Sequence, residues 1–240
     1  MSETGNFIRG LRWHIGDLDS ATSKITNFLN DKKTNHIITA NMEILSMAFK
    51  SKELKELCIN ADMHIPDGIG AVKLLKKLGF SKTKRIPGIE LCLEALKKMP
   101  EGTKIYLFGA REGIARKALE NLSLQFLHLV FVGSHEGFGY EDSKLVKEIN
   151  NSGAQVLLVA LGVPKQELWI AKNKGKLNDV RVAIGVGGSF DVWAGDVNRA
   201  PRFFQKTNLE WAWRIFSQPA RLPKFLMTIA GFLPVYLRAK

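Results

Sequence analysis

The stretch QVLLVALG at residues 155–162 indicates the fold class. A polar residue leads into an uninterrupted apolar run, which ends in a glycine, and a helical pattern begins near Pro164. An apolar run of this kind predicts a strand buried on both faces, as in a parallel sheet. The same succession of apolar run, glycine and helical pattern occurs at residues 104–121 (KIYLF, then Gly109). Strands that alternate with helices predict crossover connections and a layered α/β domain.

Further strands and helices are expected on either side of this stretch. The other strand candidates are residues 36–40, 63–65, 129–132 and 181–186, and the other helical patterns cover residues 41–58, 69–78, 89–98 and 143–150. Near Ala194 the sequence becomes helical, aromatic and basic. We therefore predict a Rossmann-like parallel sheet flanked by helices in residues 1–195, followed by a helical appendage in residues 196–240.

The positive charge of the chain is concentrated in this appendage. The 240 residues include 35 Lys and Arg against 23 Asp and Glu, a formal net charge of +12. Residues 199–240 contain eight basic residues and one acidic residue, so they carry +7 of that charge. A balance this positive indicates an anionic partner, such as nucleic acid, a phosphorylated ligand or lipid headgroups.

The sequence favours a cytoplasmic protein that contacts the inner face of the membrane without crossing it. The N-terminus lacks the pattern of a signal peptide, and Cys58 and Cys92 are expected to be buried apolar residues. A membrane-spanning helix requires about 18 to 20 apolar residues. The longest candidate, residues 225–237, has 13 residues and contains Gly231 and Pro234.

Glycines and polar residues follow the predicted strands, at the sheet edge where parallel sheets bind ligands. The candidate ligand-binding residues there are Thr39, Asn41, Asp67, Gly109, Gly133, Phe138, Gly162, Lys165, Gln166, Gly187, Gly188 and Asp191. Glycines let backbone N–H groups approach phosphates, and helix N-termini add a favourable dipole. These loops together predict a nucleotide site, although each glycine alone is better explained as a turn or a helix start.

Several other kinds of site fit the sequence poorly. GVGGSF at residues 185–190 has Phe190 where a dinucleotide fingerprint requires its third glycine, and no P-loop pattern is present. The five histidines lack paired ligand spacing. Asp17-Leu18-Asp19 resembles a metal-binding Asp-x-Asp, but Asp19 is better explained as a helix cap. We expect neither a metal nor a cofactor.

Asp67 is the candidate for acid–base chemistry. It lies between Pro66 and Gly68 at the end of a predicted strand. Partial desolvation there would raise its pKa and make it a base for a hydroxyl nucleophile. Spacing alone allows the alternative that Asp67 caps the helix beginning at Gly68. Asp191 has two similar interpretations, a hydrogen bond to a base or ribose and a local cap.

The appendage also has two interpretations. Arginine side chains suit phosphates and pyrophosphates, and tryptophans beside basic residues suit a bilayer interface. Alternatively, an amphipathic helix packs its Trp and Leu side chains on the domain while its arginines face water.

The order and spacing of these motifs resemble the WecG/TagA/CpsF family of bacterial glycosyltransferases. The motifs that carry the resemblance span residues 39–221: Thr39-Ala40-Asn41, Pro66-Asp67-Gly68, Arg85-x-x-Gly88, Gly162-x-Pro164-Lys165-Gln166-Glu167, Gly185-Val186-Gly187-Gly188-x-Phe190-Asp191, Arg199-Ala200-Pro201, Leu209-Glu210-Trp211, Arg214 and Gln218-Pro219-x-Arg221.

This resemblance implies an inverting, metal-independent glycosyltransferase. The donor would be a UDP-sugar carrying N-acetylmannosamine or a close relative, such as its uronic acid. The acceptor would be the 4-hydroxyl of GlcNAc-diphospho-undecaprenol at the cytoplasmic membrane surface, in the synthesis of wall teichoic acid or a related surface glycan. Family members are similar in forming oligomers, so a homo-oligomer is a further expectation.

The resemblance also implies roles for individual residues. Asp67 would be the catalytic base, with Thr39 and Asn41 beside it at the sugar. Gln166 would lie near the donor phosphates, Asp191 would contact uracil, and Phe138 would stack on the base. Arg214 and Arg221 would reach the diphosphate when the appendage closes over the site. The remaining residues expected to bind substrate are Arg85, Gly109, Gly133, Gly162, Lys165, Gly187 and Gly188.

Two rival functions are weaker. A nucleic-acid-binding protein that uses the basic appendage is supported by charge alone, because no recognised binding motif is present, and no nucleic-acid partner is expected. A soluble nucleotide-sugar enzyme, such as an epimerase, would require the dinucleotide fingerprint that the sequence lacks.

Overall fold

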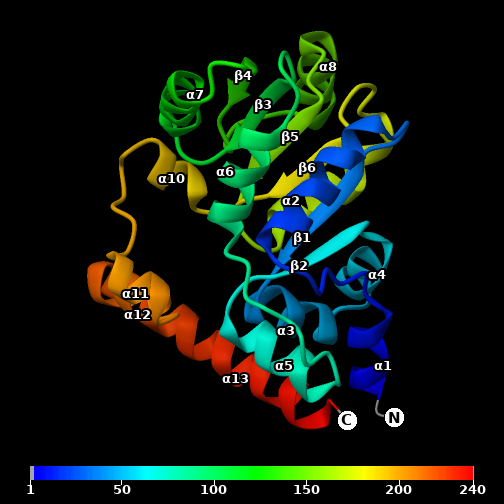
Figure 1. Ribbon diagram of the computed structural model, residues 1–240, viewed down its shortest axis with the longest axis vertical. Helices are drawn as coiled ribbons and strands as arrows, with labels where there is room; N and C mark the ends of the chain where they lie inside the picture. The colour runs from blue at the N-terminus through cyan, green and yellow to red at the C-terminus, as the bar shows by residue number, and fades with distance from the viewer. Residues whose placement is uncertain (1–2, 240) are drawn as a thin grey trace.

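The centre of the molecule is one parallel sheet. The computed structural model describes residues 3–239, without the side chains of Glu3, Thr4, Lys206 and Arg214. Within these residues six strands pair in the order β2-β1-β6-β5-β3-β4, all parallel (Figure 1). The strands are β1 (Asn35–Ala40), β2 (Met63–Pro66), β3 (Lys104–Gly109), β4 (Val130–His135), β5 (Val156–Ala160) and β6 (Val182–Gly185). The predicted Rossmann-like α/β architecture is confirmed.

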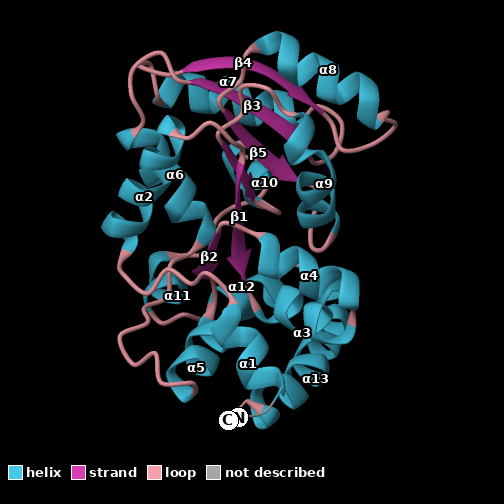
Figure 2. Cartoon of the chain, turned by 90° about the vertical axis from the view of Figure 1, so that its right-hand side faces the viewer, coloured by secondary structure: helices cyan, strands magenta, loops and turns pink. Residues whose placement is uncertain are grey.

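Helices cover both faces of this sheet. The α-helices are α1 (Glu3–Gly10), α2 (Leu18–Asn27), α3 (Met42–Lys50), α4 (Lys52–Asn60), α5 (Ile69–Lys77), α6 (Gly88–Lys98), α7 (Ile114–Gln125), α8 (Asp142–Ser152), α9 (Lys165–Asn173), α10 (Ser189–Trp193), α11 (Arg202–Lys206), α12 (Glu210–Ser217) and α13 (Leu222–Arg238). Short 3₁₀ helices are η1 (Phe28–Asn30), η2 (Lys174–Lys176) and η3 (Pro219–Arg221). Figure 2 shows α2 and α6 on one side of the sheet and α8 and α9 on the other.

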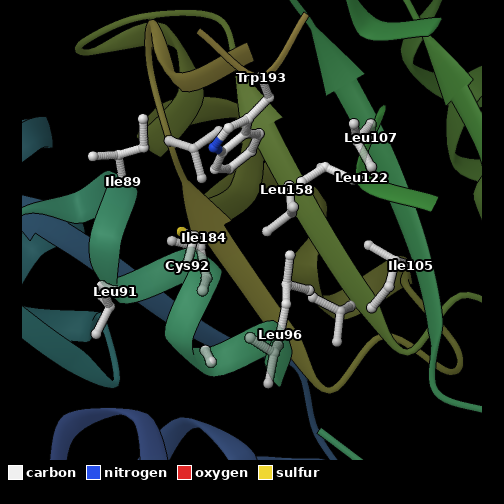
Figure 3. Packing of buried hydrophobic residues seen from close by; sticks show 14 of the residues in the cluster. Ile89, Leu91, Cys92, Leu96, Ile105, Leu107, Leu122, Leu158, Ile184 and Trp193 are labelled. Atoms are coloured by element: carbon white, nitrogen blue, oxygen red, sulfur yellow. The ribbon is translucent and has the colours of Figure 1, made fainter. Parts of the chain in front are cut away.

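The strands are apolar on both faces because both faces are packed against helices. Ile105 and Leu107 of β3 belong to the core shared with α2, α6, α7 and α10, and Figure 3 shows part of this packing. Tyr106 and Phe108, which alternate with them, belong to the core shared with α8 and α9. Alternation of side chains along a strand places successive residues in different cores, and this accounts for the uninterrupted apolar pattern.

Two details of the helices differ from the expectation. The helical pattern at residues 41–58 is divided into α3 and α4, since Ser51 is extended and its hydroxyl accepts a hydrogen bond from the N–H of Leu54 at 3.3 Å. The cap of α2 is Asp17 rather than Asp19. The Asp17 side chain accepts from the N–H of Ser20 at 3.0 Å, because Asp17 is the extended residue that precedes the first helical turn.

Helix α13 packs back onto the N-terminal half of the domain. It lies along α3 and near α1 and α5 (Figure 1). Phe232 and Val235 are buried in the core formed with α3, α4 and α5. A Cβ atom at Gly231 would collide with the Ser46 hydroxyl, so this glycine permits close approach of α13 to α3. The end of the predicted appendage is thus part of the packing around β1.

Two histidines are buried near the amino ends of neighbouring strands. His36 lies on β1 and His64 on β2, and both are almost fully inaccessible. Burial disfavours the charged imidazole. It lowers the pKa of His36 to about 3 and that of His64 to about 4. Both side chains are therefore neutral in the folded protein at neutral pH.

The contribution of these two histidines to the free energy of unfolding should fall as the pH drops from about 6.5 towards 4, because only the unfolded chain then binds protons at them. Each histidine contributes up to about 1.4 kcal/mol per pH unit over that interval. Urea denaturation at about pH 7.5 and about pH 5 measures the effect, and His36→Met should reduce the difference between the two conditions. An undiminished difference in the variant would contradict this explanation.

Candidate functional site

A cavity of about 820 Å³ opens at the carboxyl edge of the sheet. We call it the main cavity. The loops after β1, β3, β4, β5 and β6 form its inner wall, and α12, η3 and α13 close it from outside. Its polar and aromatic lining residues include Asn41, Glu43, Arg111, Phe138, Tyr140, Lys165, Asp191, Trp211, Arg221, Lys224, Phe225 and Thr228. This volume lies in the range of pockets that hold small ligands and cofactors.

The main cavity brings together eight of the residues selected from the sequence. They are Asn41, Phe138, Gly162, Lys165, Gly187, Gly188, Asp191 and Arg221. Asn41 is the N-cap of α3, and its side-chain oxygen accepts hydrogen bonds from the N–H groups of Glu43 at 2.9 Å and Ile44 at 3.1 Å. The cap fixes the start of α3 against the cavity wall. The side chain of Arg214 lies outside the described part of the structure.

Asp67 and Thr39 lie at the ends of neighbouring strands, next to the cavity wall. The Asp67 N–H donates to the Ala40 carbonyl at 3.0 Å, and the Thr39 hydroxyl donates to the Gly185 carbonyl at 3.1 Å. A Cβ atom at Gly88 would lie 3.1 Å from Thr39 Cγ2 and 3.4 Å from Asp67 Oδ2. The first turn of α6 therefore lies against both side chains. A helix N-terminus stabilises a carboxylate placed beside it.

The alternative role of Asp67 was to cap the helix that begins at Gly68, and the structure gives the N-cap of that helix, α5, no side-chain hydrogen bond. The N-cap position of α5 is occupied by Gly68, whose φ is +92°. Asp67 precedes that position and is half-buried. Asp67 follows β2, and Asn41 follows the neighbouring strand β1. Of the two residues, Asn41 lines the cavity.

Gln166 lies behind the cavity wall rather than in it. Its side chain is 2% exposed, and its oxygen accepts hydrogen bonds from the N–H groups of Gly162 at 3.2 Å and Gly187 at 3.0 Å. A Cβ atom at Gly185 would lie 2.5 Å from Gln166 Nε2. The amide thus joins the loops after β5 and β6, both of which line the cavity.

Gly109 and Gly133 have packing roles within the sheet. Gly109 has a φ of +123°, and a Cβ atom there would lie 2.5 Å from the backbone of Ala160 on the neighbouring strand. A Cβ atom at Gly133 would lie 2.6 Å from the Tyr106 ring. Neither glycine is among the residues that line the main cavity.

Arg85 connects the appendage to the domain. It forms an ion pair with Glu210 on α12 and donates to the Asn208 side chain at 2.9 Å. Arg199 extends the network by pairing with Glu90 on α6 and approaching Glu210 at 3.9 Å. Arg85 borders a separate cavity of about 440 Å³. In this structure it therefore holds α12 against the segment that precedes α6.

Among the side chains that the structure describes, four cationic ones line the main cavity: Arg111, Lys165, Arg221 and Lys224. Sequence reasoning did not select Arg111 for the site, although it lies two residues after Gly109, the glycine that follows the predicted strand. Arg111 approaches Asp196 at 2.7 Å and Asp191 at 3.6 Å. Lys224 pairs with Glu43 at 2.8 Å, which joins α13 to the start of α3. The cavity is therefore suited to an anionic ligand.

Aromatic side chains complete the lining. Phe138 is exposed at the cavity, in the loop that follows β4. Trp211 of α12 stacks on Phe225 of α13, with ring centroids 4.9 Å apart and planes 8° from parallel. A flat, exposed ring such as Phe138 can stack on a nucleobase.

Among the described residues, no group of three or more His, Cys, Asp and Glu side chains is arranged to hold a metal ion. No helix formed by these residues has both the length and the apolar character needed to cross a bilayer.

Comparison with known proteins gives consistent matches over nearly the whole chain. The model of the glycosyl transferase WecG/TagA/CpsF family matches residues 7–240. An N-acetylglucosaminyldiphosphoundecaprenol N-acetyl-beta-D-mannosaminyltransferase of Bacillus spizizenii is 32% identical over 234 residues, which cover 94% of this chain and 89% of that protein. A protein of the same name from Staphylococcus aureus strain MRSA252 is 34% identical over 232 residues, covering 93% of this chain and 91% of the relative.

Proposed function

Because the chain belongs to the WecG/TagA/CpsF family of glycosyl transferases, we propose that it transfers N-acetylmannosamine, or a close relative such as its uronic acid, to a lipid-linked acceptor. The donor is a UDP-sugar, and the acceptor is the 4-hydroxyl of GlcNAc-diphospho-undecaprenol. The names of the similar Bacillus and Staphylococcus proteins support this choice of sugar and acceptor. The product enters a surface polymer such as wall teichoic acid.

The observation that carries the proposal is the main cavity, with basic residues from both the domain and the appendage. Phe138 and Asp191 are available to the uridine, and Lys165, Arg111 and Arg221 are available to the diphosphate. Cationic side chains stabilise charge that develops on a leaving group. They support a transfer in which arginine and lysine take the part that a divalent metal takes in other sugar transferases.

Asp67 supports an inverting mechanism. In our proposal its carboxylate accepts the proton of the acceptor hydroxyl while that oxygen attacks the anomeric carbon. The bond to UDP breaks on the opposite face of the sugar, and UDP leaves with the bonding electrons. The first turn of α6 lies against this carboxylate and restricts its position. A placed base of this kind contributes about 10²- to 10⁴-fold to the rate.

The test is release of UDP from UDP-N-acetylmannosamine, with and without a short-chain GlcNAc-diphospho-lipid, in the presence of EDTA. We expect acceptor-dependent release, and the uronic acid donor is then compared under the same conditions. Release that requires added Mg²⁺ or Mn²⁺ would contradict the metal-free mechanism. A folded protein that does not bind UDP would contradict the proposal as a whole.

The outer face of α13 supports docking on the cytoplasmic membrane surface. Leucine and isoleucine side chains recur along α13 at intervals of three or four residues, and these positions are exposed: Leu222, Leu226, Ile229, Leu233 and Leu237. We call them the apolar row. This spacing places them on one side of the helix, away from the buried Gly231 and Val235. An amphipathic helix with basic residues at its ends can lie in a bilayer interface.

Replacing two members of the apolar row, Leu226→Glu together with Leu233→Glu, should weaken binding to vesicles containing anionic lipid by about tenfold or more, because two apolar insertions are lost. Co-sedimentation measures this, and UDP affinity should not change. The matched control is Leu124→Glu with Leu127→Glu. Leu124 lies at the end of α7 and Leu127 just after it, and the two residues are 75% and 84% exposed. Equal losses in both double variants would contradict docking through α13.

A further inference from the structure

Glu167 is a buried acid whose place in the fold has no explanation in stability alone. Glu167 lies in the first turn of α9 and is 1% exposed. One carboxylate oxygen accepts a hydrogen bond from Gln166 Nε2 at 2.8 Å. Among the described residues, the other oxygen has no hydrogen-bond partner. A buried carboxylate with a free oxygen is less favourable than an apolar side chain of similar size.

The surroundings of Glu167 add to this cost. Burial raises the pKa of the carboxyl to about 7, and the negative charge of Glu43 on α3 acts in the same direction. The buried thiol of Cys58 on α4 lies near enough for the Glu167 charge to contribute to raising the pKa of that thiol. Whether protonated or ionised, the acid keeps an oxygen that accepts from Gln166.

The Gln166 amide makes contacts that depend on its orientation. Its oxygen accepts from two backbone N–H groups, those of Gly162 and Gly187. Rotation of the amide by 180° would turn its NH₂ group towards both of these donors, and no hydrogen bond could form. The two backbone N–H groups favour the orientation in which the Gln166 oxygen faces them. Glu167 favours the same orientation, because its carboxylate oxygen accepts a hydrogen bond from the Gln166 NH₂ group.

We propose that Glu167 is a positioning residue of the transfer site: it orients the Gln166 amide, which in turn holds the Gly162 and Gly187 loops in the shape that binds the donor. The inference rests on the proposed function for its effect on activity. Gly162 and Gly187 line the main cavity, whereas Glu167 and Gln166 do not. The loops follow β5 and β6, which are neighbours in the sheet, so one amide can set the spacing between them.

The effect should fall on donor affinity more than on turnover. Gly162 has a φ of +75° and Gly187 a φ of +50°. Glycine reaches these values without strain but does not itself restrict the backbone to them, so the hydrogen bonds to Gln166 are needed to fix the shape of both loops. Asp67 follows β2, and β1 lies between β2 and the strands that lead into these loops. Loss of the acceptor at position 167 should therefore raise the donor KM while kcat changes little.

The experiment compares Glu167→Met with Glu167→Gln in the full chain. Methionine is similar in length and has no oxygen, whereas glutamine retains one oxygen that accepts from Gln166. In Glu167→Met we expect a donor KM raised about tenfold or more with kcat within about threefold, the effect of one lost buried acceptor. We expect Glu167→Gln to stay within about threefold of the wild type in both constants.

A second readout requires no substrate. Amide hydrogen exchange at Gly162 and Gly187 should be faster in Glu167→Met and unchanged in Glu167→Gln. Unchanged exchange and KM in a folded Glu167→Met variant would overturn the inference, and so would equal damage in both variants. If Glu167→Met does not fold, Glu167→Ala serves in its place. A wild-type protein without transfer activity would count against the proposed function, while the exchange measurement would still decide the role of Glu167.

Discussion

Asp67→Asn should lower kcat by about 10²- to 10⁴-fold and leave UDP affinity unchanged. Asparagine has the shape of aspartate and cannot accept the proton of the acceptor hydroxyl. UDP affinity should persist because Asp67 is not among the residues that line the main cavity. The carboxylate lies instead against the first turn of α6, just after the end of β2. Single-turnover transfer and UDP titration measure the two quantities separately.

The matched control for this experiment is Asp179→Asn. Asp179 lies before the amino end of β6, is exposed, and approaches Arg181 at 3.9 Å. The Asp179→Asn substitution removes the same charge at the opposite edge of the sheet and should have no effect on kcat. Near-normal turnover in a folded Asp67→Asn variant would remove Asp67 from the mechanism.

Arg221→Ala should lower kcat by about 10²- to 10³-fold, the loss observed when one group that stabilises a developing charge is removed. Arg221 lines the main cavity from η3 and is exposed, so its loss should leave the fold intact. Arg221→Lys should restore part of the activity, because lysine keeps the charge without the paired donors of the guanidinium group. Steady-state kinetics together with circular dichroism check both expectations.

Arg116→Ala provides the control for loss of one positive charge. Arg116 is an exposed residue of α7 that approaches Glu120 at 3.7 Å, and it does not line the main cavity. Its replacement should leave kcat unchanged. A normal kcat in Arg221→Ala as well would contradict a role of Arg221 in the transfer and leave it as a surface residue of the appendage.

Local patterns in the sequence predicted much of the fold. The expected strand at residues 104–108 is β3 (Lys104–Gly109), and the one at residues 36–40 is β1 (Asn35–Ala40). The order β2-β1-β6-β5-β3-β4 was beyond such reasoning, because the neighbours of a strand depend on contacts between distant segments. The division between α3 and α4 at Ser51 was also missed, since the apolar spacing continues across it.

The site was predictable where the residue type and the strand end coincide. Asn41, Phe138 and Asp191 follow strands and line the main cavity, as expected for the carboxyl edge of a parallel sheet. The burial of Gln166 was not evident, because the same amide could have faced a ligand. The pairing of Arg85 with Glu210 joins residues 125 positions apart, and no local pattern reveals it.

Helix α13 has a consequence for how far a substrate must travel. Its inner side packs on α3, its first turn supplies Lys224 to the main cavity, and its apolar row faces outwards. An α-helix with its side chains is about 10 to 12 Å across. If α13 lies on a bilayer, the cavity wall is therefore within about one helix diameter of the lipid headgroups. A lipid-anchored acceptor could then reach the site by lateral diffusion alone, and its polyprenyl chain could remain in the bilayer throughout the transfer.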